Sequence, residues 1–388
     1  MKILMLAPEP FFQPRGTPIS VYLRIKALSD LGHDVDLVTY HLGEDKEIPR
    51  LKIMRIPRLF FIKKIKIGPS CAKIPLDFLL TAKAVTQLFK KKYDFIFSHE
   101  EGALFGAILG KLWRIPHIYD MHSSLPQQLE NFDFSRSKLL KKIFVGMERF
   151  ILKNSQAVIV ICPDLLNQVE REGYAARSVL LENFIDFEPD EYSAVEVQEK
   201  RREYAAENQK IVLYAGNFQP YQGIPLLLEA ASKITDKRIV FLLVGESEEA
   251  VARMRKKAEE SGTEDMIQFT GQVPPSQMPL FTGMADVLVS PRLSGTNTPL
   301  KIYSFLKSGK PVVATRLWTH TQILNDEIAV LVEPDAESMA RGILFACFDQ
   351  GAQDKARAAK EMAGREYTHD RYKEKMSLVL AKAGGEAG

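Results

Sequence analysis

Hydrophobic residues in this chain alternate between short, nearly continuous runs and longer segments in which they recur at helical spacing. Short apolar runs are typical of strands buried in a parallel sheet, and the longer segments are typical of amphipathic helices. Their alternation predicts an α/β architecture. We expect strands at residues 2–7, 34–40, 51–56, 93–98, 117–121, 157–161, 178–183, 210–216, 238–245, 267–271, 285–291, 311–314 and 329–334. We expect helices between them that include 17–31, 76–91, 138–154, 223–234, 248–261 and 299–308.

The expected strands form two series, separated by an acidic, helix-prone segment that begins at Glu188. A chain of 388 residues is longer than one hydrophobic core usually needs, so two domains are expected. We place the first at 1–187 and the second at 188–367, followed by a C-terminal helix (368–388) that packs back on the first domain. Open α/β sheets bind ligands at the carboxyl ends of their strands, so the loops there decide the chemistry.

Composition indicates a soluble globular protein, with 46% hydrophobic and 26% charged residues. The first residues predict a strand and not a signal peptide, and no uncharged apolar run approaches the roughly 18 residues of a membrane-spanning helix. Cys71, Cys162 and Cys347 match no metal or disulfide pattern. We therefore expect a cytoplasmic protein.

Charge is divided unevenly along the chain. Residues 1–150 carry a net charge of +9 (24 Lys/Arg, 15 Asp/Glu), and residues 151–388 carry −6 (28 and 34). Residues 50–70 hold seven basic residues and no acidic one, interleaved with Leu59, Phe60, Phe61, Ile62, Ile65 and Ile67. Such a segment suits anionic lipids, which predicts a peripheral enzyme at the inner face of the plasma membrane. A nucleic-acid partner is not expected, because no recognition motif is present.

A second basic, amphipathic segment covers residues 138–154. We interpret its apolar positions as core packing beneath a solvated basic face. Gly102, Gly106 and Gly110 are spaced four apart, which favours a closely packed helix face over a phosphate loop.

Residues 292–314 read as a loop, a helix and a strand. Thr298 is expected to cap the helix, Pro299 to occupy its first position and Gly309 to end it. Backbone N–H groups at such a helix start attract an anion. Neither G-x-G-x-x-G after the first strand nor G-x-x-x-x-G-K-[ST] occurs, which argues against a dinucleotide fingerprint and a P-loop.

Several motifs occur together in a telling order: "PRGTPISVYLRIKALSDLGHDV", "IPHIYDMHSS", "GNFQPYQGIPLLLEAA", "FLLVGES", "IQFTGQVPPSQM" and "SGTNTPLKIYSFLKSGKPVVA". Over nearly its whole length the chain resembles the family 4 glycosyltransferases. The resemblance implies the GT-B fold, in which two Rossmann-like doubly wound domains face each other across a cleft. It also implies metal-independent, retaining transfer of a sugar from a nucleotide sugar, without a cofactor, to a lipid, lipid-linked or glycan acceptor in envelope or polysaccharide biosynthesis.

The resemblance further implies where the donor is bound. The donor-binding candidates are Gly16, Asn217, Gln222, Gly223, Gly245, Gln272, Val273, Arg292, Gly295, Thr296, Asn297, Thr298, Lys301 and Ser304.

This chain departs from the family pattern at four charged positions. The Arg and Lys that usually contact the diphosphate are replaced by Asn217 and Gln222, and the two usual glutamates by Thr296 and Ser304. Departure of the sugar leaves negative charge that must be stabilised. We hypothesise that Arg292 and Lys301 supply the missing cations; the alternative is that both are solvated surface residues.

On the acceptor side, the resemblance makes His122 the catalytic candidate, and Asp120 either orients it or lies in the sheet. Arg15, Thr17, Glu100 and Glu101 are acceptor-side candidates, although the two glutamates also suit a first helical turn. In this family the departing β-phosphate takes the acceptor's proton, so no enzyme nucleophile is expected.

Two other functions fit the same fold. One is a non-catalytic nucleotide-sugar-binding subunit, which would bind without turnover. The other is a nucleotide-sugar epimerase, which would act on the donor alone. No pattern in the sequence specifies the donor base, the sugar, the acceptor or an oligomeric state.

Overall fold

The computed structural model describes residues 1–13, 16–60, 62, 65, 73–127, 138–183 and 192–385. It divides the chain into two compact units, Met1–Asn183 with His369–Gly388 (unit 1) and Phe184–Thr368 (unit 2). The boundary expected at residue 187 lies outside the described residues.

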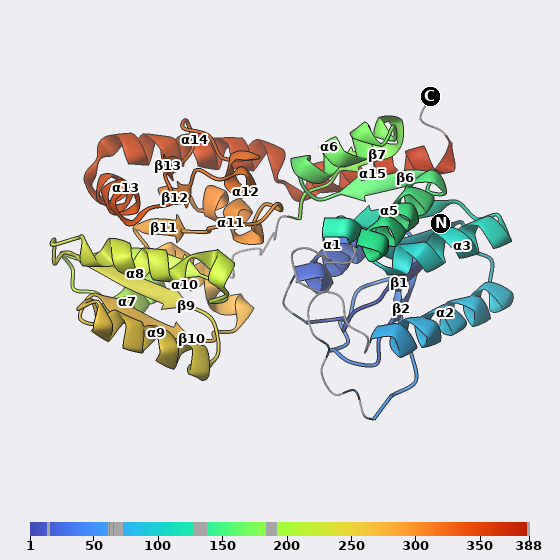
Figure 1. The fold of residues 1–388 in the computed structure, drawn as a ribbon, viewed down its shortest axis with the longest axis horizontal. Coiled ribbons are helices and arrows are strands. Elements are labelled where there is room, and N and C mark those ends of the chain that lie inside the picture. Colours follow the sequence, from blue (N-terminus) through green and yellow to red (C-terminus); the bar gives the residue numbers. More distant parts are fainter. Residues whose placement is uncertain are drawn as a thin grey trace. The chain divides into compact units, whose positions relative to one another are not determined.

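Unit 1 contains a seven-stranded parallel sheet with the strand order β3-β2-β1-β4-β5-β6-β7. Figure 1 labels β1, β2, β6 and β7 of this sheet. Its strands are β1 (Lys2–Ala7), β2 (Asp34–Thr39), β3 (Leu51–Arg55), β4 (Phe95–His99), β5 (His117–Met121), β6 (Ala157–Val160) and β7 (Ser178–Leu180). Its helices are α1 (Gly16–Asp30), α2 (Lys73–Lys90), α3 (Gly102–Trp113), α5 (Lys138–Lys153), α6 (Pro163–Arg171) and α15 (His369–Gly384), with a short 3-10 turn at Ala175–Arg177.

From β1 the chain adds β2 and β3 towards one edge of the sheet, and then β4, β5, β6 and β7 towards the other edge, so the switch point of this parallel sheet lies between β1 and β4. Right-handed crossovers then place α1 on one face of the sheet and α2, α3, α5 and α6 on the other. Helix α15 contacts α1 and the strands β5, β6 and β7, and so shares the face of α1. The carboxyl ends of β1, β4 and β5 consequently lie side by side at the switch point, where open sheets bind ligands.

Unit 2 repeats the design with a six-stranded parallel sheet, β10-β9-β8-β11-β12-β13. Its strands are β8 (Lys210–Ala215), β9 (Ile239–Val244), β10 (Ile267–Gly271), β11 (Val287–Ser290), β12 (Val312–Thr315) and β13 (Val330–Val332). Its helices are α7 (Ala194–Arg202), α8 (Ile224–Ser232), α9 (Glu248–Glu260), α10 (Met278–Met284), α11 (Leu300–Ser308), α12 (Trp318–Thr321), α13 (Ala336–Phe348) and α14 (Gln350–Glu366), with 3-10 turns at Pro220–Gln222 and Pro275–Gln277. Here the switch point lies between β8 and β11.

Both sheets are held by apolar strands covered on both faces, as the continuous runs predicted. The strand residues Ile211–Tyr214 and Ile239–Val244 are buried, and helices α8 and α13 pack against them. The glycine spacing on α3 is explained by close packing, because a Cβ at Gly106 would lie 2.4 Å from the Ser98 hydroxyl and one at Gly110 would lie 2.9 Å from the Ile115 carbonyl oxygen.

One local prediction is wrong. Pro299, in an extended conformation, is the N-cap of α11, and the helix begins at Leu300; Thr298 makes no capping hydrogen bond, and its hydroxyl is buried without a partner. The core packing expected for α5 is largely present: Ile151 and Leu152 are buried and Phe144 and Met147 pack, partly buried, against the same core, whereas Ile143 is 49% exposed.

Candidate active site

In unit 2, two cationic side chains meet at the switch point of the sheet. Lys301 stands in the first turn of α11 and reaches the end of β8, where its Nζ donates to the Ala215 carbonyl at 3.2 Å. The same Nζ lies 4.0 Å from the centre of the Tyr214 ring. Arg292 follows β11 directly, and its guanidinium lies over the Tyr221 ring. Since β8 and β11 are neighbours, the two cations share one edge of the sheet.

No carboxylate among the described residues forms an ion pair with either cation. Arg292 instead donates to the Asn297 carbonyl and to the Thr319 hydroxyl, both at 2.9 Å, while its Nε is buried without a partner. Burial, with a smaller contribution from the nearby Arg292, lowers the pKa of Lys301 to about 7. Burial also lowers the pKa of Arg292. Two partly desolvated positive charges without a counter-ion are the electrostatics of an anion site.

The layer beneath the cations is neutral. His320 donates from Nδ1 to the Thr315 carbonyl at 2.8 Å and accepts the Ser290 hydroxyl at Nε2, 2.9 Å away. Burial, with smaller contributions from Lys301 and Arg292, lowers its pKa to about 4, so the imidazole is uncharged at neutral pH. The Thr319 hydroxyl and the Gln322 amide hold the carbonyls of Asn297 and Thr296 and thereby fix the loop before α11.

Glycines let the backbone approach closely at this edge. Gly223 has φ +74° and a Cβ there would lie 1.8 Å from the Pro291 carbonyl oxygen. At Gly245, φ is +118° and a Cβ would lie 2.4 Å from the Gly216 carbonyl oxygen. A Cβ at Gly295 would lie 3.0 Å from the Arg292 guanidinium. Only glycine fits the first two positions without moving the backbone.

The remaining donor candidates are distributed as follows. Gln222 is buried with its Oε1 unpartnered, whereas Asn217 is exposed, its carbonyl accepting the Tyr214 hydroxyl. Ser304 donates to the Lys301 carbonyl within α11. Gln272 and Val273 follow β10. Gly16 and Thr17 begin α1 in unit 1, and Arg15 lies outside the described residues.

In unit 1, acidic and imidazole side chains gather at the switch point between β1 and β4. His122 follows β5 and is 4% exposed; its Nε2 lies 3.3 Å from the Asp120 Oδ2. Asp120 lies within β5 and its carboxylate contacts His122, so the two placements expected for it occur together. Glu100 follows β4 with φ +47° and accepts the Ser123 hydroxyl at 3.1 Å. Burial raises the pKa of Glu100.

Glu9 and Lys73 extend this cluster. Glu9 follows β1, is 8% exposed and has an Oε1 without a hydrogen-bond partner; burial raises the pKa of its carboxyl well above the usual range. Lys73 forms an ion pair with Glu101 at 2.6 Å. Burial by itself lowers the pKa of Lys73, but the ion pair with Glu101 outweighs burial and raises that pKa above its usual value. Glu101 is thus held by an ion pair.

Sequence reasoning missed five polar members of this site. They are Glu9 and Lys73, Arg24 and His99, which both contact the Asp120 carboxylate, and Tyr372, which accepts a hydrogen bond from Arg24. One signal was available: Arg24 lies on the same helical stripe as Val21, Ile25 and Leu28, where an apolar residue is expected. Glu9 and His99 stand at strand ends, which alone is weak evidence.

A metal ion would find one set of ligands in the described part of the chain. His99, Asp120 and His122 bring their ligand atoms within 4.8 Å of one another. The Asp120 Oδ2 already accepts the Arg24 Nε at 2.9 Å, so a bound cation would have to compete with a guanidinium for the same oxygen. The three side chains are better described as a hydrogen-bonded group.

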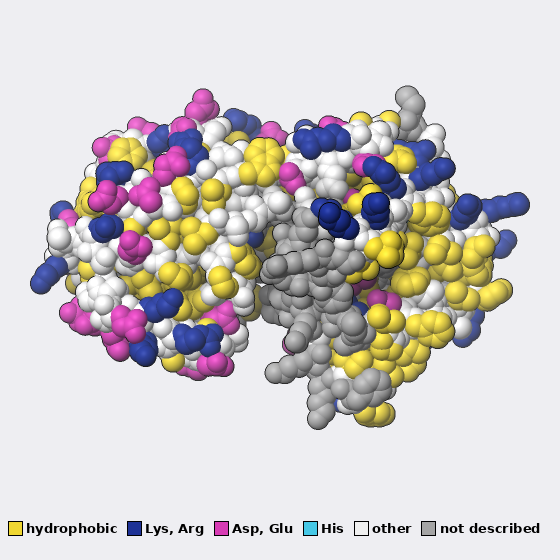
Figure 2. Space-filling view, viewed as in Figure 1, with side chains coloured by type: hydrophobic (Ala, Val, Ile, Leu, Met, Phe, Trp, Pro, Cys, Tyr) yellow, Lys and Arg dark blue, Asp and Glu magenta, His cyan; other side chains and the backbone are white. Residues whose placement is uncertain are grey.

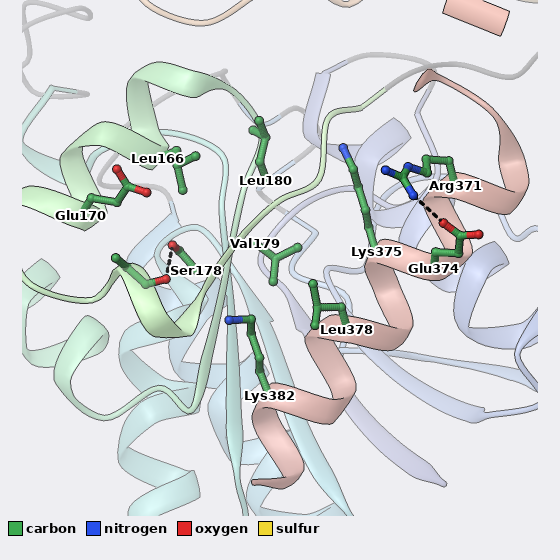
Figure 3. A pocket seen from close by; sticks show the side chains of 11 residues that line it. Leu166, Glu170, Ser178, Val179, Leu180, Arg371, Glu374, Lys375, Leu378 and Lys382 are labelled. Carbon is green, nitrogen blue, oxygen red and sulfur yellow. Dashed lines mark hydrogen bonds and ion pairs between the residues drawn. The ribbon is translucent and has the colours of Figure 1, made fainter. Parts of the chain in front are cut away.

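A pocket of about 480 Å³ lies elsewhere in unit 1, between α6, the edge strand β7 and α15 (Figure 3). Its basic side chains are satisfied within the protein: Arg371 by Glu374, Lys375 by Glu182 and Lys382 by the carbonyl of Ala176. Arg371 and Lys375 are therefore paired with carboxylates, whereas Lys382 contacts only a neutral carbonyl oxygen and keeps its charge.

Comparison with known proteins agrees with the fold. The family model "Glycosyl transferases group 1" matches residues 196–365, and "Glycosyltransferase Family 4" matches residues 14–189. The chain belongs to the family 4 glycosyltransferases. Its two parallel sheets are the Rossmann-like domains of the GT-B fold, and the protein is an enzyme of the sugar-transferring class.

Named relatives act in the same class of reaction. A phosphatidyl-myo-inositol mannosyltransferase of Mycolicibacterium smegmatis is 23% identical over 354 residues, 89% of this chain and 84% of its own length. A glycosyl transferase assigned to colanic acid biosynthesis in Escherichia coli K12 is 28% identical over 213 residues; there the match spans about half (52%) of each chain. The crystal structure of Anabaena HepE in complex with UDP has a TM-score of 0.77 at 18% identity, covering 98% of this chain and 100% of that one.

Proposed function

We propose that this glycosyltransferase moves a sugar from a nucleoside-diphosphate sugar to a lipid or lipid-linked acceptor, with retention and without a metal ion. The observation that carries the proposal is the pair Arg292 and Lys301, two cations at one sheet edge with no carboxylate paired to either in the described residues. A diphosphate supplies the missing negative charge. The UDP bound by HepE, and the lipid acceptor named for the mycobacterial relative, support the same assignment.

In the proposed reaction, the acceptor oxygen bonds to the anomeric carbon while the bond from that carbon to the β-phosphate breaks. The acceptor's proton moves to a β-phosphate oxygen. Arg292 and Lys301 stabilise the charge that develops on the diphosphate, in the place of the usual Arg and Lys. Partial desolvation strengthens this effect. On the acceptor side, His122 of unit 1 is the proposed catalytic residue.

Donor binding and turnover test the proposal separately. Calorimetry with UDP-, GDP- and ADP-sugars should show binding of at least one, and CMP-sugars, which carry a single phosphate, serve as the matched control. Release of free nucleotide should require membrane lipid extract. Lys301→Ala should abolish binding, whereas His122→Ala should abolish release and spare binding.

Other outcomes identify the rival functions. Binding without release under any acceptor would make the protein a binding subunit, and isomerisation of the donor without acceptor would make it an epimerase. Absence of binding to every diphosphate sugar would refute the donor site.

We also propose that unit 1 binds an anionic membrane surface, through α2, α3 and α5. These helices lie in one layer, α3 contacting both others. Their outward apolar side chains are strongly exposed: Ile74 67%, Phe78 73%, Phe89 77%, Leu112 68% and Leu139 69%. Figure 2 shows hydrophobic side chains gathered over unit 1. Exposed lysines on the same helices, including Lys90, Lys111, Lys138, Lys141 and Lys142, add attraction of roughly 1 kcal/mol each near such lipids.

The surface that we propose differs from the segment 50–70 that the sequence favoured. Ile62 and Ile65 are buried in the core around β1 and α2, while Phe60 is 76% exposed and lies under Arg58. Phe61 and Ile67 lie outside the described residues. None of the described helices is long and apolar enough to cross a membrane.

Vesicle sedimentation tests the surface. Wild-type protein should sediment with phosphatidylglycerol vesicles and much less with phosphatidylcholine vesicles, and high salt should release it. Phe78→Ser with Phe89→Ser should abolish sedimentation. Phe345→Ser with Phe348→Ser, two exposed positions on α13 of unit 2, is the matched control. Equal loss in both double variants would refute the assignment.

A further inference from the structure

A line of buried polar side chains joins the C-terminal helix α15 to His122. Arg24 on α1 donates from Nη1 to the Tyr372 hydroxyl of α15 and from Nε to the Asp120 Oδ2 at 2.9 Å. Asp120 in turn holds His122. We propose that Tyr372 and Arg24 are positioning residues, which fix the imidazole of His122 through Asp120. This inference rests on the proposed function, in which His122 is the catalytic residue.

Arg24 is held in one orientation by three partners. Besides Tyr372 and Asp120, its Nη2 donates to the Leu181 carbonyl at 3.1 Å and lies 3.4 Å from the Asp120 Oδ1. The side chain is fully buried. A planar guanidinium can serve these directions at once, whereas a lysine ammonium is a single point charge. The structure therefore uses arginine for its geometry as well as its charge.

Asp120 is the acceptor on which the line converges. Its Oδ2 lies 2.9 Å from the Arg24 Nε, 3.2 Å from the His99 Nδ1 and 3.3 Å from the His122 Nε2. Although burial favours the neutral acid, Arg24 and the two imidazoles hold the pKa of Asp120 well below its usual range. The ionised carboxylate selects the His122 tautomer that carries its proton on Nε2.

Tyr372 supplies a contact that packing alone does not require. The ring is 3% exposed and lies beside the guanidinium, 5.4 Å from its carbon. Phenylalanine would keep that ring and lose only the hydroxyl. The Nη1 of Arg24 would then lack its buried acceptor, which favours a shift of the guanidinium away from Asp120. Because α15 begins where the chain returns to unit 1, this helix completes the His122 site from the far end of the sequence.

The test compares Tyr372→Phe and Arg24→Lys with Val379→Ala, a truncation at another fully buried position of α15. Nitrogen-15 NMR of the histidine rings, with the His122 signal identified by its loss in His122→Asn, reports the tautomer without any substrate. Tyr372→Phe and Arg24→Lys should shift the His122 Nε2 signal and change its tautomer ratio, and Val379→Ala should not. Where a donor and acceptor support turnover, kcat should fall between about 10-fold and 100-fold with the donor KM unchanged.

Each result decides the proposal. An unchanged His122 spectrum in Tyr372→Phe overturns it, and so does a change of equal size in Val379→Ala. If Tyr372→Phe unfolds where Val379→Ala is folded, the hydroxyl has a structural role and the positioning role is rejected. A shifted spectrum in a protein that transfers no sugar would retain the positioning and refute the proposed function alone.

Discussion

The buried ammonium of Lys301 should cost the ligand-free protein stability, and removing it should make the fold more stable. Burial and Arg292 lower the pKa of Lys301 from 10.5 to about 7. A lysine whose pKa is lowered on folding destabilises the folded state wherever it must be charged there. The penalty is complete below the folded pKa and fades as pH rises towards the unfolded value, so between about pH 7 and 10.5 stability increases with pH.

The magnitude follows from that shift at about 1.4 kcal/mol per pH unit. The penalty to the free energy of unfolding is ~5 kcal/mol at about pH 6, where it is complete, and ~2 kcal/mol at about pH 9, a difference of ~3 kcal/mol. Lys301 is only partly buried by surface area, so solvent reduces these values. We expect the advantage of Lys301→Met over wild type to shrink by about 1–3 kcal/mol between the two pH values.

Trp318 provides the assay. The chain has two tryptophans, Trp113 in unit 1 and Trp318 on α12, beside Thr319, which contacts Arg292. In a Trp113→Phe background, fluorescence during urea unfolding reports on unit 2 alone. Lys307→Met, in the last turn of α11, is the control; removing a cation from a helix C-terminus should destabilise by a few tenths of a kcal/mol, roughly equally at both pH values. The buried-cation site would be refuted if Lys301→Met were less stable than wild type at about pH 6. It would also be refuted if the gain in free energy of unfolding of Lys301→Met over wild type did not depend on pH.

Two further changes test other parts of the structure. Gly223→Ala should lower the free energy of unfolding of unit 2 by more than about 2 kcal/mol, because a Cβ there would lie 1.8 Å from the Pro291 carbonyl oxygen. The control Gly364→Ala, in open space on α14, should raise it by about 0.5–1 kcal/mol. Similar effects of the two variants in urea unfolding would contradict the packing. Burial raises the pKa of Asp77 to about 7, and the carboxyl accepts the Tyr40 hydroxyl, so wild-type stability should fall as pH rises from about 4 to 7. Asp77→Asn should then stabilise unit 1 near about pH 8 by ~1–2 kcal/mol and not near about pH 4, followed through Trp113 in a Trp318→Phe background.

The strands and most helices were predictable because their signal is local. Each expected strand is present, and the six expected helices begin and end within about three residues of the prediction. The predicted α/β fold with two Rossmann-like domains is confirmed. The errors occurred where burial depends on neighbours: the Thr298 hydroxyl is buried without a partner and caps no helix, and Ile62 and Ile65 enter a core that the basic segment did not indicate.

The candidate site was predictable only in part. Motif order pointed to Arg292, Lys301 and His122, and parallel strands bring such residues to one sheet edge within each unit. Their functional roles stay predictions. The sequence could not show that Arg292 and Lys301 lack a carboxylate partner in the described residues, since that depends on which side chains surround them after folding.

By itself, then, the sequence determined the alternation of strands and helices, the two-domain α/β fold and the family, because hydrophobic period and motif order are properties of neighbouring residues. The tertiary structure alone decided which polar groups share a buried environment. Arg24 meets Asp120 across 96 residues and Tyr372 across 348, and no local pattern encodes such contacts. Burial then sets the charge and the orientation of these groups, because a desolvated ion keeps its charge only beside the partner that the fold brings to it.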